Sequence, residues 1–342
     1  PIVTIDEAME NKSFLDDPII VSKGDSKKAI KNAKNRLTGL LSIGGQEHYY
    51  LEGQVAMSIP TEDDEMIIHS STQNPTEVQH LAAHVLNVPQ NAIEVVTRRM
   101  GGGFGGKETD SSQLACICAI FSEKTKKPVK ARLSRKDDIL LTGKRHDFIA
   151  NYDVGFGDDG LIQGITMDLS AKCGYSLDLS KAIVSRALFH SDNAYFIPNA
   201  TFRGFLCKTN TASNTAFRGF GGPQGMLAIE NIVEEIANSL GLDPLEVRRV
   251  NFYQKEQNNT TPYDQVVEDN IIAEITDELI ADSNYYSRKK AIDKFNKENK
   301  YLKKGLAFSP VKFGISFTTQ LLNQAGALVS IYKDGSIYLN HG

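Results

Sequence analysis

A glycine-rich run stands out near residue 100. Five of the six residues from 101 to 106 are glycine, and the sixth is Phe104. The apolar pattern predicts a strand at residues 93–97 and a helix at residues 111–124, so the run lies in the loop between them. Each glycine costs about 0.5–1 kcal/mol relative to alanine in regular structure, because it loses more backbone freedom on folding. Left-handed backbone or close approach to a ligand would offset that cost, and an aromatic ring among glycines indicates a ring displayed to a planar ligand.

A second run, at residues 214–225, repeats this layout with glycines around Phe220 and a helix after them. Apolar residues at helical spacing from residue 229 to residue 240 predict that helix, and Gly241 ends it. Arg218 adds a cation whose fork geometry suits an oxyanion, and the N-terminus of a helix favours anions. The two loops could converge on one anionic, flat-faced ligand, but composition alone leaves convergence and separate structural turns equally open.

A third glycine pair opens residues 44–50, where Gly44 and Gly45 precede Gln46. Glycine lets the backbone approach a ligand closely, and the Gln46 side chain can donate an amide hydrogen bond. Taken alone, this segment is better interpreted as a structural turn.

The run at residues 101–106 also matches the G-x-G-x-x-G pattern of dinucleotide-binding loops. Two features argue against that interpretation. The preceding strand ends in the polar pair Arg98-Arg99, where an apolar strand end is expected. The acidic residue at the required distance, Glu123, falls inside the predicted helix instead of at the end of a strand.

The composition limits the classes of function. The net charge of −4 over 342 residues gives no sign of a nucleic-acid surface. No apolar run is long enough to span a membrane, and no signal peptide is evident. None of the four cysteines forms a C-x-x-C pair, so we expect no zinc or iron–sulfur site on this chain, and reduced thiols in a cytoplasmic or peroxisomal protein.

Strands, glycine loops and helices alternate along the chain, which predicts an α+β fold with mixed sheets and packed helices. We expect a first domain over residues 1–304 and a second, truncated domain over residues 305–342. Further strands are predicted at residues 55–59, 66–70, 148–156, 161–169, 327–332 and 336–340, and further helices at residues 76–86, 271–280 and 286–299. Because the chain starts at Pro1 and stops just after a predicted hairpin, we expect that both ends were cut from something longer.

These residues bear a resemblance to a known family. The Gly-Gly-Gln-Glu-His segment at residues 44–48, the runs at residues 101–108 and 216–224, and the Phe-Gly-Ile-Ser-Phe-Thr segment at residues 313–318 resemble the molybdopterin-binding part of the xanthine dehydrogenase/aldehyde oxidase family. Further similar segments occur in the same order at residues 186–190 and 242–251. The resemblance covers essentially the whole chain, and the long glycine motifs are far more specific than a lone G-x-G-x-x-G.

The resemblance implies a role for each matching residue. Gln46 would hydrogen-bond an oxo ligand of molybdenum, and Phe104, Gly105 and Arg218 would bind the cofactor in the environment of the metal without ligating it directly. Phe104 and Phe220 would hold a planar substrate, and Thr318 would add a hydrogen bond.

Glu108 and Arg186 distinguish the branches of the family. They would be catalytic and substrate-binding groups, because a carboxylate and a guanidinium suit the heteroatoms of a purine such as hypoxanthine or xanthine. Aldehyde-oxidising relatives tend to have apolar residues at both places. The resemblance thus implies a purine hydroxylase, with an aldehyde or other N-heteroaromatic hydroxylase as the alternative for substrate and a structural salt bridge as the alternative for these two residues.

The resemblance also implies parts that this chain lacks. The general base of the family is a glutamate in a later Gly-Glu segment, which nothing in this chain matches. The 2Fe-2S and FAD modules lie on other segments or subunits. We therefore expect the chain alone to be inactive, to need the remaining molybdopterin-binding segment, and to act in a homo-oligomer such as a dimer.

Overall fold

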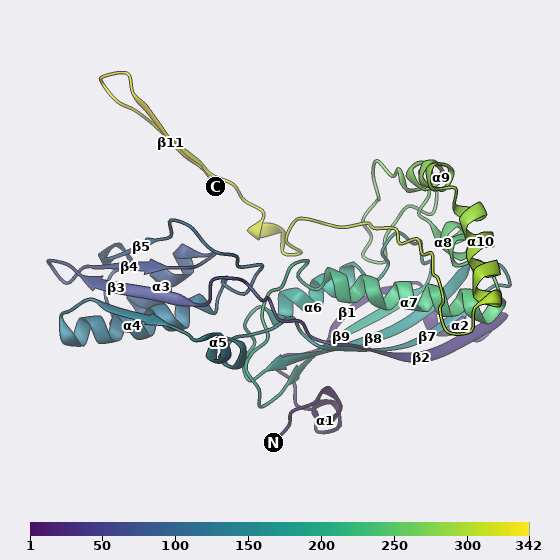
Figure 1. The fold of residues 1–342 in the computed structure, drawn as a ribbon, viewed down its shortest axis with the longest axis horizontal. Coiled ribbons are helices and arrows are strands. Elements are labelled where there is room, and N and C mark those ends of the chain that lie inside the picture. Colours follow the sequence, from purple (N-terminus) through teal and green to yellow (C-terminus); the bar gives the residue numbers. More distant parts are fainter. Residues whose placement is uncertain (342) are drawn as a thin grey trace. The chain divides into compact units, whose positions relative to one another are not determined.

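The computed structural model describes residues 1–341, and Gly342, the last residue of the predicted second domain, lies outside the described residues. The chain divides into two compact units, Pro1–Lys312 and Phe313–Gly342. Helices and mixed sheets alternate in the first unit, so the predicted α+β class is confirmed (Figure 1).

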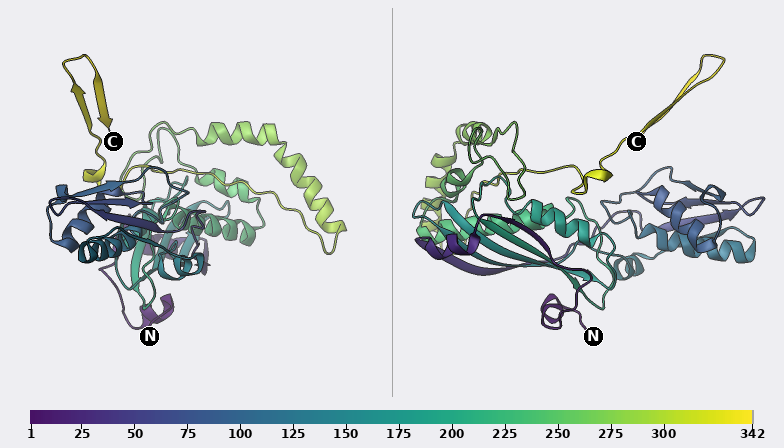
Figure 2. Two further views of the ribbon diagram at one scale, coloured as in Figure 1. Left: turned by 60° about the vertical axis from the view of Figure 1, so that its left-hand side comes forward. Right: turned by 180° about the vertical axis from the view of Figure 1, so that it is seen from behind.

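A five-stranded sheet forms the larger core of the first unit, in the order β1-β9-β8-β7-β2. Only β8 and β9 pair in parallel; the other neighbours are antiparallel. Helices α6 and α7 lie along one face of this sheet (Figures 1 and 2), and the buried apolar stripe of α7 belongs to the same hydrophobic core as the buried apolar residues of β8. The bounds are β1 Ile19–Lys23, β2 Asn35–Ile43, β7 Phe148–Phe156, β8 Ile162–Gly174, β9 Ala200–Lys208, α2 Ser26–Asn32, α6 Ser180–Phe189, α7 Gly222–Leu240 and α8 Pro244–Asn251.

Two predictions in this core can be checked closely. The hairpin predicted over residues 148–169 is confirmed as β7 and β8, joined by a turn in which Gly160 has a φ of +80°. The helix predicted from residue 229 begins earlier, at Gly222, because Pro223 is tolerated in the first turn, where its missing N–H has no partner to lose. Its end at Gly241 is confirmed.

A four-stranded sheet in the order β5-β4-β3-β6 forms a second core with helices α3 and α4. Only β4 and β5 are parallel, so this sheet is not the open parallel sheet that a dinucleotide fold requires. Glu123 lies in α4, as expected. The bounds are β3 Val55–Pro60, β4 Met66–Ser70, β5 Ile93–Val96, β6 Val129–Arg132, α3 Pro75–Leu86 and α4 Ser111–Thr125.

The remaining elements of the first unit are short or peripheral. Residues 305–312 have no helix or strand but remain with this unit, because the Asn193 amide donates to the carbonyl of Pro310 at 2.8 Å. The domain boundary between residues 304 and 305 stays a prediction. The bounds are α1 Ile5–Glu10, α5 Arg135–Leu141, α9 Ile272–Ser283 and α10 Tyr285–Glu298, with a 3-10 turn at Gln90–Ala92.

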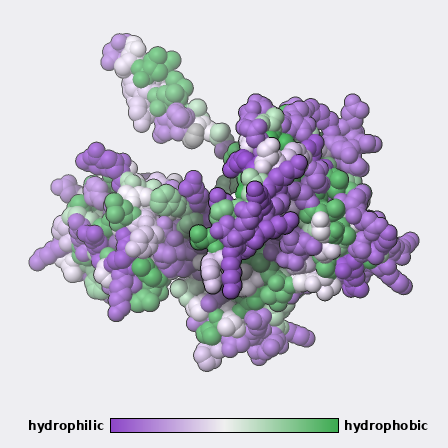
Figure 3. Space-filling model, turned by 45° about the vertical axis from the view of Figure 1, so that its right-hand side comes forward, coloured by the Kyte–Doolittle hydropathy of each residue, from purple (hydrophilic) through white to green (hydrophobic). Residues whose placement is uncertain are grey.

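The second unit holds a 3-10 turn, Gln320–Leu322, and an antiparallel hairpin of β10, Ala327–Ile331, and β11, Ile337–His341. This hairpin was predicted from the sequence and is confirmed. Within the unit its large apolar side chains are exposed, and the hairpin carries green side chains at the top of Figure 3. An isolated hairpin is only marginally stable in water, and side chains that are exposed within the unit add little to its stability.

Candidate functional site

The 101–108 loop is built around one tight turn. The Gly106 N–H donates to the carbonyl of Gly103 at 2.9 Å, and the two residues between them, Phe104 and Gly105, have φ of +55° and +102°. Two successive left-handed residues define a type I′ turn. Phe104 is 50% exposed, so the turn displays it to solvent.

Buried polar side chains anchor this loop to the four-stranded sheet. The Glu52 carboxylate accepts hydrogen bonds from the Gly101 N–H at 2.7 Å, the Ser71 hydroxyl at 2.7 Å and the Lys107 ammonium at 3.2 Å. Lys107 is fully buried, with its ammonium 4.8 Å from the centre of the Tyr50 ring. Burial lowers the pKa of Lys107, and Glu52 opposes that shift by favouring the charged form.

Gln73 is a functional candidate that sequence reasoning missed. Its amide oxygen accepts from the Gly105 N–H at 2.8 Å and the Lys107 N–H at 3.3 Å, so the oxygen faces the 101–108 loop. Its NH₂ group makes no hydrogen bond within the described residues and remains a donor for a ligand. The pairing of the strands could have indicated Gln73. Strands β4 and β5 are parallel neighbours, so the segments that follow them leave the sheet at the same edge. Gln73 lies in the segment after β4, and the 101–108 loop lies in the segment after β5.

The 214–225 loop contains the same turn. The Gly222 N–H donates to the carbonyl of Gly219 at 3.0 Å, and Phe220 and Gly221 between them have φ of +52° and +93°. Here the turn leads directly into α7. Its backbone lies in close contact with α6: a Cβ on Gly221 would be 2.0 Å from the carbonyl oxygen of Ile183.

The two loops converge, so the hypothesis of convergence is confirmed. The Arg218 N–H donates to the carbonyl of Phe104 at 3.0 Å. A Cβ on Gly105 would lie 2.5 Å from the carbonyl oxygen of Ala216, which explains why that position is glycine. The same oxygen lies 2.6 Å from Nε2 of His48, and burial lowers the pKa of this histidine, which favours its neutral form.

Gln46 is joined to the 214–225 loop through Arg145, a residue that sequence reasoning also missed. Arg145 donates from Nε to the Gln46 amide oxygen at 2.6 Å and from Nη2 to the carbonyl of Arg218 at 2.7 Å. Because arginine can only donate, the oxygen of the Gln46 amide must face it, and the Gln46 NH₂ group faces away. Arg218 itself is exposed.

Glu108 and Arg186 occupy different settings at this convergence. Glu108 is half-buried, and its pKa is raised by burial and then by the nearby charge of Asp178. Arg186 is buried in α6, with its guanidinium carbon 5.9 Å from the centre of the Phe220 ring, and burial lowers its pKa. No ion pair within residues 1–341 involves Glu108, so the two residues do not form the structural salt bridge that was the alternative.

Asp110 is a further titratable group beside the site. Burial raises its pKa to about 7, and the Gly143 N–H, which donates to it at 2.8 Å, opposes the shift. Thr318 lies in the second unit, where it is exposed, and its expected contact with substrate stays a prediction.

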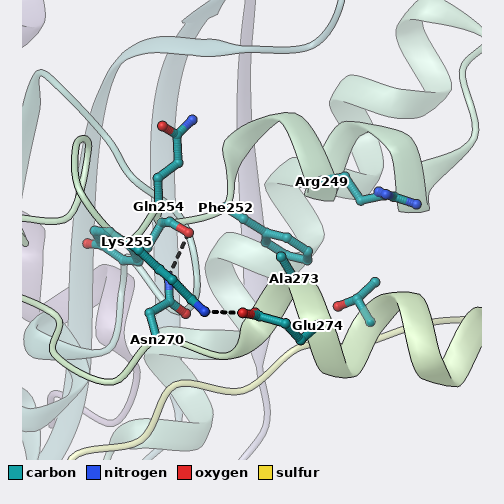
Figure 4. Close-up of a pocket in the computed structure, with 9 residues that line it drawn as sticks. Arg249, Phe252, Gln254, Lys255, Asn270, Ala273 and Glu274 are labelled. Carbon is teal, nitrogen blue, oxygen red and sulfur yellow. Dashed lines mark hydrogen bonds and ion pairs between the residues drawn. The ribbon is translucent and has the colours of Figure 1, made fainter.

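Two of the cavities that lie outside the turns differ in their relation to the glycine loops. One, of about 370 Å³, is lined by residues of α8, α9 and the segment between them, including Phe252, Asn270 and the ion pair of Lys255 with Glu274 (Figure 4). None of its lining residues belongs to the glycine loops. The other, of about 360 Å³, lies beside Gln46. Among the helices of residues 1–341, none has both the length and the apolar character needed to cross a bilayer.

The convergence therefore presents amide donors, the exposed Phe104, the half-buried Phe220 and an exposed cation. The donors are the NH₂ groups of Gln46 and Gln73, and the cation is Arg218. This set can hold a group that carries negative charge on several oxygen or sulfur atoms and has a flat part beside it.

Two family models match the chain. Both are described as molybdopterin cofactor-binding domains, and they match residues 8–252 and residues 278–342. Proteins with curated names also match along the whole chain. It is 46% identical over 341 residues to a xanthine dehydrogenase of Dictyostelium discoideum, and 48% identical over 342 residues to a xanthine dehydrogenase/oxidase of Rattus norvegicus. Each alignment covers 100% of this chain but only 25% and 26% of the relative, so the chain spans about a quarter of their length.

Solved structures share the fold at lower identity. An aldehyde oxidoreductase from Desulfovibrio desulfuricans superposes with a TM-score of 0.80 at 22% identity, over 99% of this chain and 37% of that one. Quinoline 2-oxidoreductase from Pseudomonas putida gives 0.79 at 21% identity, over 88% of this chain and 40% of that one. At these identities the likeness concerns the fold alone.

Proposed function

This chain belongs to the family of molybdopterin cofactor-binding domains, and from that premise we propose that it is part of a molybdenum-dependent purine hydroxylase that resembles xanthine dehydrogenase. Identity of 44–48% to proteins named xanthine dehydrogenase or xanthine dehydrogenase/oxidase supports the purine branch. The observation that carries the proposal is the convergence of the 101–108 and 214–225 loops, joined by the hydrogen bond from Arg218 to Phe104.

The molybdenum cofactor fits this convergence. Gln46 and Gln73 each have the amide oxygen bonded within the protein, which leaves the two NH₂ groups to donate to oxygen or sulfur atoms of the cofactor. Phe104 and Gly105 would line it, and Arg218 would offset its negative charge. When bound, the cofactor supplies the oxidation that places an oxygen atom from water on the substrate, and the protein orients the reactants.

Glu108 and Arg186 are proposed to bind the purine and to act in catalysis. The half-buried Glu108 has no ion-pair partner among residues 1–341, and burial raises its pKa, which favours a role in proton transfer at a ring nitrogen or lactam oxygen. Arg186 is charged and adjacent to Phe220, so it can stabilise negative charge on a ring held against that phenylalanine. Phe104 would cover the substrate, and Thr318 would add a hydrogen bond.

An aldehyde or other N-heteroaromatic substrate is the second candidate. Aldehyde and quinoline oxidoreductases share this fold, although at an identity that carries no argument about substrate. A half-buried carboxyl group favours a purine, because a substrate without hydrogen-bonding groups would leave Glu108 unpaired and lose affinity.

The whole protein would need parts outside this chain. We propose that the chain alone is inactive because the general base lies outside it, and that iron–sulfur and FAD modules elsewhere accept the electrons. The span of about a quarter of the relatives' length supports both points. A homo-oligomer and a cytoplasmic or peroxisomal location complete the proposal. The location is supported by four cysteines that are all free thiols within the described residues.

The test is urate formation by the complete protein that carries this chain. After its molybdenum content is established, xanthine is supplied with an artificial electron acceptor. We expect urate from the wild type, and a loss of kcat/KM of about a hundredfold or more for Glu108→Gln. Molybdenum without urate formation would move the substrate to an aldehyde or another heteroaromatic compound, and absence of molybdenum would reject the hydroxylase.

A further inference from the structure

Arg145 is a buried cation: it is 7% exposed, and it has no ion-pair partner among residues 1–341. Burial lowers its pKa to about 10, which still leaves the guanidinium charged at neutral pH. Removing a charge from water is costly unless an opposite charge or several hydrogen bonds replace the lost hydration.

Neutral acceptors surround this guanidinium. It donates to the Gln46 amide oxygen at 2.6 Å, to the carbonyl of Arg218 at 2.7 Å and to that of Phe217 at 3.5 Å, and its carbon lies 4.1 Å from the centre of the Phe217 ring. The Arg145 N–H also donates to the backbone carbonyl of Gln46 at 3.0 Å. These contacts hold the charge in place without neutralising it.

The segment that carries Arg145 supports the 214–225 loop at further points. The Thr215 N–H donates to the carbonyl of Lys144 at 3.0 Å, and the Lys144 N–H donates to the Asn214 amide oxygen at 3.2 Å. Next to Arg145, the carbonyl of His146 accepts a bond from the Gln224 amide at 3.4 Å. Arg145 thus belongs to a short backbone segment, residues 144–146, that is hydrogen-bonded to the loop at several points.

We propose that Arg145 is a positioning residue that holds the Gln46 amide and the 214–225 loop in the geometry that binds an anionic cofactor, and that its uncompensated charge favours the more negatively charged, reduced state of that cofactor. This inference rests on the proposed function. It differs from a structural role because a cation kept without a counter-ion contributes an electrostatic potential that a neutral hydrogen-bond donor would not.

The test uses Arg145→Gln and Arg145→Lys in the complete protein. The readouts are molybdenum and pterin per chain, iron and FAD as measures of assembly, and the midpoint potential of the molybdenum. Arg145→Gln should retain iron and FAD and lose about tenfold in molybdenum and pterin, because hydrogen bonds from a charged donor are lost. In the cofactor that remains, a tenfold weaker preference for the reduced state lowers the midpoint potential by about 59 mV for a one-electron couple.

Arg145→Lys separates charge from geometry. Lysine keeps the cation but lacks the planar fork, so we expect a potential close to that of the wild type and a cofactor content between those of the wild type and Arg145→Gln. Arg135→Gln is the matched control, because Arg135 also donates to two backbone carbonyls, at 2.7 and 2.8 Å. Arg135 is exposed, and within residues 1–341 it makes no hydrogen bond to Gln46 or to the 214–225 loop. We expect it to match the wild type.

An Arg145→Gln protein with wild-type molybdenum, pterin and potential would overturn the inference. If that variant loses iron and FAD as well, Arg145→Lys decides, and wild-type cofactor content in Arg145→Lys would then overturn the positioning role. A wild-type protein without molybdenum would instead overturn the proposed function, so the two failures are distinguishable.

Discussion

The 101–108 and 214–225 loops contain the same type I′ turn, yet the protein supports them in different ways. Aligned on Phe104 and Phe220, the first loop continues with Lys107 and Asp110, whereas the second has Pro223 and Met226 at the corresponding positions. Buried charges and the Gln73 amide hold the first. Close backbone contact with α6 and the Arg145 guanidinium hold the second.

This difference separates local from tertiary causes. The Gly-Phe-Gly-Gly sequence specifies the turn in both loops, because it supplies the residues that accept left-handed backbone. The surroundings then decide what each loop tolerates. The first loop should respond to changes in charge and pH at Lys107 and Asp110. The second should respond to changes in side-chain size at Gly221 and to loss of the Arg145 cation.

The largest expected effect is steric. In Gly221→Ala the new Cβ would lie 2.0 Å from the carbonyl oxygen of Ile183 at a φ of +93°, so we expect the unfolding free energy to fall by about 3–5 kcal/mol. Gly241→Ala is the control, because its Cβ would meet nothing within 4 Å at a φ of +66°, and it should cost about 1 kcal/mol. Denaturant titration measures both, and equal losses would show that the contact with α6 is unimportant.

The second-largest effect on stability is expected from removing the buried charge of Lys107. Lys107→Met keeps the length of the side chain but leaves the Glu52 carboxylate without its cation. Because Glu52 is 37% exposed and partly screened by solvent, we expect a loss of about 2 kcal/mol in unfolding free energy. Pro223→Ala alters the corresponding position of the other loop, where the side chain is exposed, and should change stability by less than about 1 kcal/mol. If thermal unfolding ranks the pair the other way, charge does not support the first loop.

Asp110, which follows the first loop, should make the stability of the protein depend on pH. Burial raises the pKa of Asp110 from 3.8 to about 7, so between these values the native state holds a proton that the unfolded chain has lost. The unfolding free energy should therefore fall as pH rises from about 4 to about 7. Asp110→Asn keeps an acceptor for the Gly143 N–H and should add about 1–3 kcal/mol at pH 8 but nothing at pH 4. A pH-independent effect would contradict this.

The smallest effect on stability is expected for Phe104→Ala, because the ring is 50% exposed and contributes little packing. We expect a change within about 0.5 kcal/mol. Phe220→Ala should cost about 1–2 kcal/mol, since its ring is half-buried near Arg186. Both variants should raise KM for xanthine in the complete protein. A large loss of stability in Phe104→Ala would show that the ring serves the fold and not a ligand.

Elements with clear periodicity were predictable, and the two edge strands of the larger sheet were not. The β7–β8 hairpin and helices α3, α4 and α7 follow from apolar spacing and glycine turns. No strand is predicted before residue 44, yet β1 and β2 form the edges of the larger sheet. The apolar Leu40 on β2 is 62% exposed, which blurs the alternation that would reveal an edge strand.

The candidate site was predictable to the extent that its residues lie in the glycine runs themselves. Phe104, Glu108 and Arg218 are visible in that way, whereas Gln73 and Arg145 are not. Gln73 and Arg145 are linked to the site by hydrogen bonds to residues far away in the sequence. Arg145, for example, lies 99 residues from Gln46. No local pattern records such a pairing, because it depends on how the sheets place the loops.

The contact between Gly105 and the Ala216 carbonyl constrains how this sequence can drift. Any single-nucleotide change in a glycine codon that alters the residue introduces a Cβ, and at this position the Cβ would lie 2.5 Å from that oxygen. A tolerated substitution therefore needs a second change that moves the opposite loop. Laboratory evolution of this region should accordingly recover paired changes across the two loops and seldom a single step at Gly105.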